Sequence, residues 1–152
     1  METIDPAKAA RVWQRVQSAP EPEKREQGLQ ALILEKWTAA ATYLLLSRRF
    51  SGRESALLKK MFQEEQTQTS CLKGIYTLIT GDHPIVKAIP PQQESIENTL
   101  RRCYGREMQC LAQYEARRSD PEFGQVFTRL AQQEQEHCRS ILALLGNYKP
   151  KK

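Results

Sequence analysis

The chain has 152 residues, 39% of them hydrophobic and 27% charged, which is the composition of an ordinary globular protein with one sizeable core. Its net charge of +5 comes from scattered basic residues, and no basic stripe interleaved with aromatics marks a nucleic-acid surface. The apolar run 39–46 is too short to span a bilayer, and the N-terminus lacks the features of a signal peptide. We therefore expect a cytoplasmic protein that binds neither nucleic acid nor membrane.

The four cysteines lie inside helical patterns and form no Cys-x-x-Cys pair, which argues against a zinc ribbon or a rubredoxin-type site. We expect them to be buried thiols in a reducing compartment. They are Cys71, Cys103, Cys110 and Cys138.

The first segment of the chain, residues 1–22, predicts a short amphipathic helix and a Pro-rich linker. Asp5 before Pro6 is a typical helix start, and the helix should run to Val16 with Trp13 on its apolar face. Ala19-Pro-Glu-Pro22 ends it. The simplest interpretation is a lid packed on the main body.

Residues 23–148 show helical periodicity in four long segments, and no stretch alternates with the period of a strand. We expect helices at about 23–50, 54–80 and 95–118, and a fourth that starts after Ser119-Asp-Pro121 and ends at Gly146. Residues 81–94 contain three prolines and form a connection long enough to run along a bundle. Residues 149–152 are a basic tail.

Polar residues interrupt the apolar stripe of each of these helices at one level. They are Glu35 in the first helix, Glu65 and Gln68 in the second, Glu107 in the third, and Glu134 and His137 in the fourth.

A shift of 69 residues superimposes the first helix pair on the second, so that Glu65 falls on Glu134 and Gln68 on His137. Two similar antiparallel hairpins joined by a long crossover form a four-helix bundle, whose inward polar residues meet near its middle. Di-iron and di-manganese carboxylate proteins place one Glu on each of two helices and Glu-x-x-His on each of the other two. We therefore predict an all-α four-helix bundle with a metal site.

The chain resembles the rubrerythrin-like branch of the ferritin-like proteins over residues 28–146. The resemblance rests on Leu130-Ala-Gln-Gln-Glu134-Gln-Glu-His137 followed by Ile141-Leu142, and on Glu107 standing seven residues before Tyr114.

The resemblance implies iron, with manganese as an alternative, bound as two ions or one, and either peroxide or oxygen reduction or oxidation of ferrous iron. The chain would then be an oxidoreductase of the peroxidase or ferroxidase type. It also implies Glu65 and Glu134 as bridging ligands, Glu35 and Glu107 as terminal ligands, and His137 bound to one ion.

Three departures from the family pattern accompany these matches. Gln68 stands where the family has a second His, and an amide is a poorer ligand for iron than imidazole. The strict repeat maps Glu107 onto Thr38, so the first-helix ligand is either Glu35 or Thr38. The cysteine module that supplies electrons in full-length rubrerythrins is absent, so a redox cycle would need a separate electron donor.

Two alternatives follow from the residues themselves. Taken on its own, His137 is better interpreted as a core histidine hydrogen-bonded to Glu65 or Glu107. The whole bundle also suits a ferritin-like domain that has lost its metal and serves as a structural or interaction domain, possibly as a homodimer. We expect His83, in the connection, to be exposed.

Overall fold

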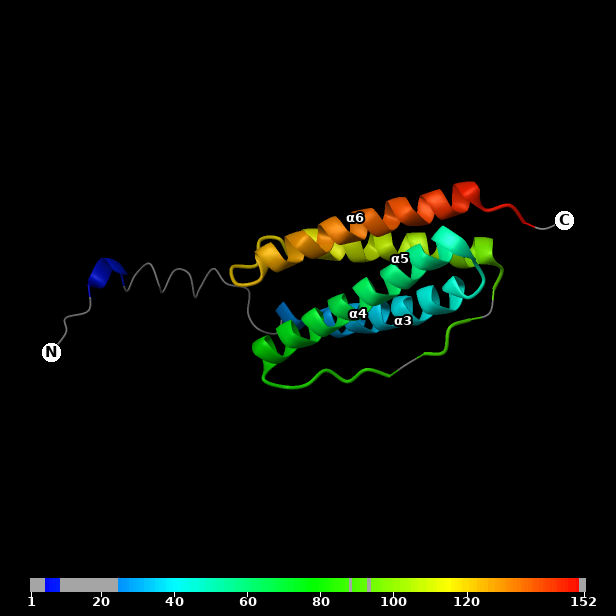
Figure 1. The fold of residues 1–152 in the computed structure, drawn as a ribbon. Coiled ribbons are helices and arrows are strands. Elements are labelled where there is room, and N and C mark those ends of the chain that lie inside the picture. Colours follow the sequence, from blue (N-terminus) through cyan, green and yellow to red (C-terminus); the bar gives the residue numbers. More distant parts are fainter. Residues whose placement is uncertain (1–4, 9–24, 88, 93, 151–152) are drawn as a thin grey trace.

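The computed structural model describes residues 5–8, 25–87, 89–92 and 94–150. Its four long α-helices are α3 (Leu29–Ser47), α4 (Gly52–Thr80), α5 (Ile96–Ala116) and α6 (Gly124–Asn147). The described residues contain no strand, so the all-helical prediction is confirmed. α3 and α4 form one antiparallel hairpin, α5 and α6 form a second, and the two hairpins lie side by side (Figure 1).

The helix ends follow from local chain chemistry. Gly28, with φ at 84°, stands before α3, and Gly81, with φ at 79°, caps α4. Positive φ is a conformation that glycine adopts readily, so α3 begins later than the predicted residue 23. The predicted start of the fourth helix was also early, because the carboxylate of Asp120 accepts hydrogen bonds from the backbone N–H groups of Glu122 and Phe123 before α6 begins.

The connection between α4 and α5 runs past the bundle from the end of one hairpin to the start of the other (Figure 1). Its described residues are mostly exposed, and His83 is exposed as expected. This connection lets each hairpin keep its own antiparallel pairing.

The core consists of two apolar clusters with polar side chains between them along every helix. In α3, Leu29 and Ile33 belong to the first cluster, and Tyr43 and Leu46 belong to the second. The same division recurs in the other three helices. The level that separates the two clusters therefore contains the polar positions that interrupt the predicted stripes.

Most of the predicted N-terminal helix lies outside the described residues, and so does the end of the basic tail, residues 151–152. At residues 5–8, Asp5 Oδ1 accepts a hydrogen bond of 3.0 Å from Ala7 N. Cys103, Cys110 and Cys138 are buried and Cys71 is half-buried. In the part of the chain that the structure describes, every helix is too short or too polar to cross a membrane.

Candidate functional site

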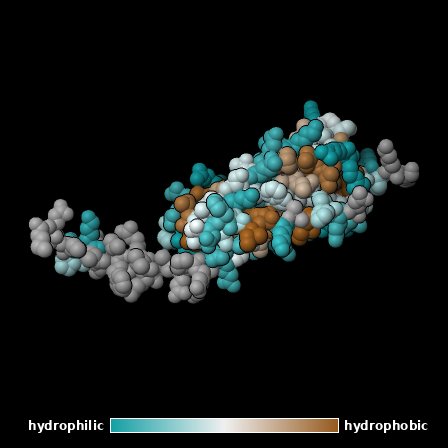
Figure 2. Space-filling model, turned by 90° about the horizontal axis from the view of Figure 1, so that it is seen from below, coloured by the Kyte–Doolittle hydropathy of each residue, from teal (hydrophilic) through white to brown (hydrophobic). Residues whose placement is uncertain are grey.

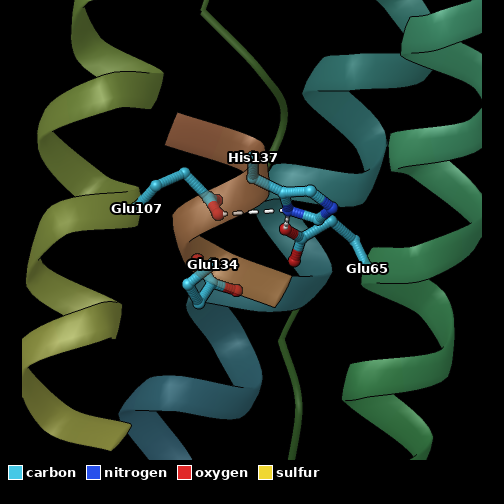
Figure 3. Close-up of side chains that lie close together, drawn as sticks. All are labelled: Glu65, Glu107, Glu134 and His137. Carbon is cyan, nitrogen blue, oxygen red and sulfur yellow. Dashed lines mark hydrogen bonds and ion pairs between the residues drawn. The ribbon is translucent and has the colours of Figure 1, made fainter. Parts of the chain in front are cut away.

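Three carboxylates and one imidazole meet at the level between the two apolar clusters, which we call the polar layer. Glu65 comes from α4, Glu107 from α5, and Glu134 and His137 from α6, and their side chains point toward one another (Figure 3). All four are buried, with at most 2% of their surface exposed. Each offers one ligand atom, and these atoms lie within 4.8 Å of one another, so the four groups could hold a metal ion.

The remaining helix of the bundle, α3, contributes an ammonium group to the same place. Lys36 of α3 is completely buried, and its Nζ lies 2.5 Å from Glu134 Oε1, 3.2 Å from Glu65 Oε2 and 3.3 Å from Glu107 Oε1. A buried ammonium needs such partners because burial of an unpaired charge costs several kcal/mol. Lys36 is thus the counter-ion of the three acids.

The expectation that Glu35 supplies the first-helix acid is wrong. The Glu35 side chain is 43% exposed and forms a surface ion pair of 3.7 Å with Arg106. Thr38, the other candidate, is also outside the cluster, and its carbonyl accepts a hydrogen bond from Thr42 Oγ1 within α3. Neighbouring residues of a helix point about 100° apart, so turning Glu35 outward turns Lys36 inward.

One pattern in the sequence indicates Lys36. Lys36 stands seven residues before Tyr43, as Glu107 stands seven residues before Tyr114, and both tyrosines are fully buried. Lys36 therefore occupies in the first hairpin the position that Glu107 occupies in the second. The signal was missed because the strict shift of 69 residues, which fits α4 and α6, does not fit α3 and α5.

His137 is hydrogen-bonded as a core histidine. Its Nδ1 donates to Glu65 Oε1 at 3.0 Å and to Glu107 Oε2 at 3.3 Å. The other ring nitrogen, Nε2, has no hydrogen-bond partner among the described residues, and Glu64 Oε2 is 3.8 Å away. Burial alone would lower the pKa of His137, but the hydrogen bonds to Glu107 and Glu65 raise it to about 10. At neutral pH the ring is a second buried cation.

The charges of the cluster depend on one another. Burial works against the Lys36 ammonium, but the three carboxylates outweigh it and raise the pKa of Lys36 well above its usual value. Burial also opposes ionisation of Glu107, yet Lys36 and His137 hold the pKa of this carboxyl well below its usual range.

Burial raises the pKa of Glu134 well above its usual value, against the pull of Lys36. Burial likewise raises the pKa of Glu65.

Gln68 is buried but belongs to a different hydrogen-bond chain from that of the three cluster carboxylates. The hydroxyl of Tyr114 donates to Gln68 Oε1 at 2.9 Å, and Gln68 Nε2 donates to Gln133 Oε1 at 2.7 Å. Gln133 Nε2 in turn donates to Glu64 Oε2 at 2.6 Å. The buried hydroxyl of Tyr114 is thus bonded to Gln68.

At two positions, the first hairpin therefore has a cation and a poorer ligand where the second hairpin has a carboxylate and an imidazole. Lys36 stands where the second hairpin has Glu107, and Gln68 stands where it has His137. A protonated amine has no lone pair to give a metal, and its charge repels a divalent ion at short range. With Lys36 in place, the cluster does not fit the two-ion form of the site that the resemblance implied.

The chain matches no protein-family model, no curated protein and no solved structure.

Proposed function

We propose that this protein is a metal-independent, ferritin-like four-helix bundle that works as an interaction domain, with the Lys36 ammonium in the place of a metal ion. The observation that carries the proposal is the position of Lys36 Nζ, within 3.3 Å of all three buried carboxylates. The metal in such a bundle supplies positive charge to inward acids. Here a residue of the chain itself supplies that charge.

A second candidate is the rubrerythrin-like metalloprotein, which would reduce peroxide or oxygen, or oxidise ferrous iron, with a separate electron donor. The observation that favours it is the set of three carboxylates and His137, whose ligand atoms lie within 4.8 Å of one another. This candidate requires the Lys36 side chain to leave the cluster. It also requires one ion to bind without a nitrogen ligand, because Gln68 stands where the family has a second His.

Bound metal distinguishes the two candidates. The protein is purified without chelator and analysed for iron, manganese and zinc, and it is also titrated with Fe(II) under anaerobic conditions. We expect far less than one metal ion per chain, no uptake of Fe(II), and the same melting temperature with and without EDTA. Stoichiometric iron or manganese that is lost in a Glu134→Ala variant would establish the metalloprotein instead.

The Lys36→Met variant gives the matching positive experiment. Methionine has a similar length but no charge, so the three carboxylates are left without the ammonium group that contacts them. We expect this variant to take up one divalent ion, with Mn²⁺ and Zn²⁺ as probes, because carboxylate and imidazole ligands suit both. Lys59→Met, a change at an exposed position of α4, should bind none.

A further inference from the structure

The solvent-facing side of α3 is apolar. We name it the α3 stripe, and its side chains project along one face of the helix at intervals of three and four residues. Trp37 and Leu45 are each 43% exposed, and the remaining members are half-buried. The members of the α3 stripe are Leu34, Trp37, Thr38, Ala41, Leu44 and Leu45.

The α3 stripe lacks the charges that helices normally place toward water. Between Leu29 and Ser47 the charged residues are Glu35 and Lys36, and Lys36 is buried. A helix that is apolar on all sides is usually covered on all sides. Brown, hydrophobic atoms interrupt the teal surface of the face seen in Figure 2, so the monomer leaves apolar surface uncovered.

A groove of about 290 Å³ lies beside the stripe, between α3 and α4. Ala40 and Ala41 form part of its α3 wall, and Phe62 and Ser70 form part of its α4 wall. The Lys73 ammonium lies 4.8 Å from the centre of the Trp37 ring. Small residues on the walls allow another backbone to approach closely, and aromatic residues are common anchors of protein interfaces.

The order of residues along the stripe suits a second copy of the same helix. Trp37 and Leu45 stand four positions before and after Ala41, and Thr38 and Leu44 stand three positions before and after it. Two copies of α3 that pack antiparallel about a two-fold axis at Ala41 would place Trp37 against Leu45, and Thr38 against Leu44, on both sides of the axis. The small side chain of Ala41 lies where the two helices come closest.

The charges at the ends of the stripe fit the same arrangement. Half-exposed Glu35, which pairs with Arg106 of its own chain, lies in the second turn of α3, and exposed Arg48 follows the end of the helix. Antiparallel packing about Ala41 brings Glu35 of each copy close to Arg48 of the other. A two-fold interface requires such self-complementarity, and opposite charges at its rim select the antiparallel orientation.

We propose that a second copy of this chain packs on the α3 stripe, so that the protein is a two-fold symmetric dimer. The proposal rests on the interaction role proposed above and names the partner. Pairing would remove Trp37 and Leu45 from water, which is the driving force for association.

The dimer is tested by the mass of the full chain in solution. We expect sedimentation equilibrium at micromolar concentrations to give twice the chain mass of 17.5 kDa. Ala41→Glu places two like charges together at the axis and should raise the dissociation constant on the order of a hundredfold. Leu45→Glu repeats the test at a more exposed position, and circular dichroism confirms that each variant is folded.

Two controls make the test specific to this surface. Leu142→Glu changes a residue of α6 that is 50% exposed, and it should leave the dimer unchanged. Arg48→Glu, which leaves the Glu35–Arg106 pair intact, should weaken the dimer. The Glu35→Arg/Arg48→Glu double variant should restore it, because each copy then offers the opposite pair of charges.

A monomeric wild-type chain would overturn the proposal and assign the stripe to a partner of different sequence. A dimer that Ala41→Glu and Leu45→Glu leave intact would overturn it too, since the interface would then lie elsewhere. These outcomes are independent of metal content: a dimer loaded with iron contradicts the proposed function alone, and a metal-free monomer contradicts the dimer alone.

Discussion

Lys36 is the residue on which the chemistry of the buried cluster depends. Its ammonium contacts three carboxylates that come from three different helices. Removing one partner of a buried ion pair costs far more than the pair itself contributes, because the remaining charges stay buried without compensation.

Lys36→Met should therefore lower the free energy of unfolding by roughly 3–5 kcal/mol at pH 7. The loss should shrink at pH 5, because the uncompensated carboxyls then take up protons. Urea unfolding at both pH values, in the presence of a chelator, measures the difference. Lys59→Met serves as the surface control and should change the stability by less than about 0.5 kcal/mol; a similar loss in both variants would contradict the role assigned to Lys36.

His137 predicts a loss of stability in alkaline solution. The folded pKa of His137 is raised to about 10 by its hydrogen bonds to Glu107 and Glu65. A raised pKa contributes stability that is complete below the unfolded value of about 6.5 and is lost as the pH rises to about 10. Urea unfolding between pH 7 and pH 10 should thus show a decline of roughly 3–5 kcal/mol.

His137→Gln should be less stable at pH 7 and should lose most of this decline, since glutamine does not titrate. The same decline in both proteins would show that other groups cause it.

At the scale of the helices, each start and end is fixed by a few local groups. The chain before α3 is held by Arg117, which donates hydrogen bonds to the carbonyls of Arg25 and Gln27. Gly28 then turns the chain into α3 with φ at 84°. This junction sets where α3 begins and therefore contributes to the level at which Lys36 meets the acids.

Gly28→Ala should destabilise the protein by about 1–2 kcal/mol, because a side chain at positive φ is strained. An added Cβ would also lie 3.3 Å from both Arg117 Nη2 and Gln113 Oε1. Gly74→Ala is the matched control in the middle of α4, where a Cβ meets nothing within 4 Å; it should stabilise the helix by about 0.5–1 kcal/mol. Thermal unfolding of the two variants tests the opposite signs.

At the scale of the whole molecule, the polar layer joins the two hairpins. Each helix contributes at least one charged group to it, and the two apolar clusters lie on either side. Any group that binds in this layer therefore contacts both hairpins and stabilises the folded bundle relative to the unfolded chain.

The Lys36→Glu/Gln68→His double variant gives the first hairpin the same ligand types that Glu107 and His137 provide in the second. We expect it to bind divalent metal, with Mn²⁺ as the probe, and to gain about 2.7 kcal/mol of stability when free metal is a hundred times the dissociation constant. The metal content and the shift in melting temperature on adding EDTA provide the readouts. A variant that folds but binds no Mn²⁺ would show that the two hairpins are not equivalent around the layer.

The sequence by itself determined the helices, their pairing and the inward positions of α4, α5 and α6. These helices carry polar residues on their outer sides, so the interrupted stripe identified Glu65, Gln68, Glu107, Glu134 and His137 as inward residues. All five are buried at the expected level.

Only the tertiary structure decided which side of α3 faces the core. Because apolar residues surround this helix, its periodicity does not distinguish the turn that buries Glu35 from the turn that buries Lys36. Packing against the other three helices makes the choice, and the three acids favour a cation over a fourth acid. The orientation of α3 about its own axis thus puts the counter-ion Lys36 where a ligand was expected, and it leaves the α3 stripe facing water.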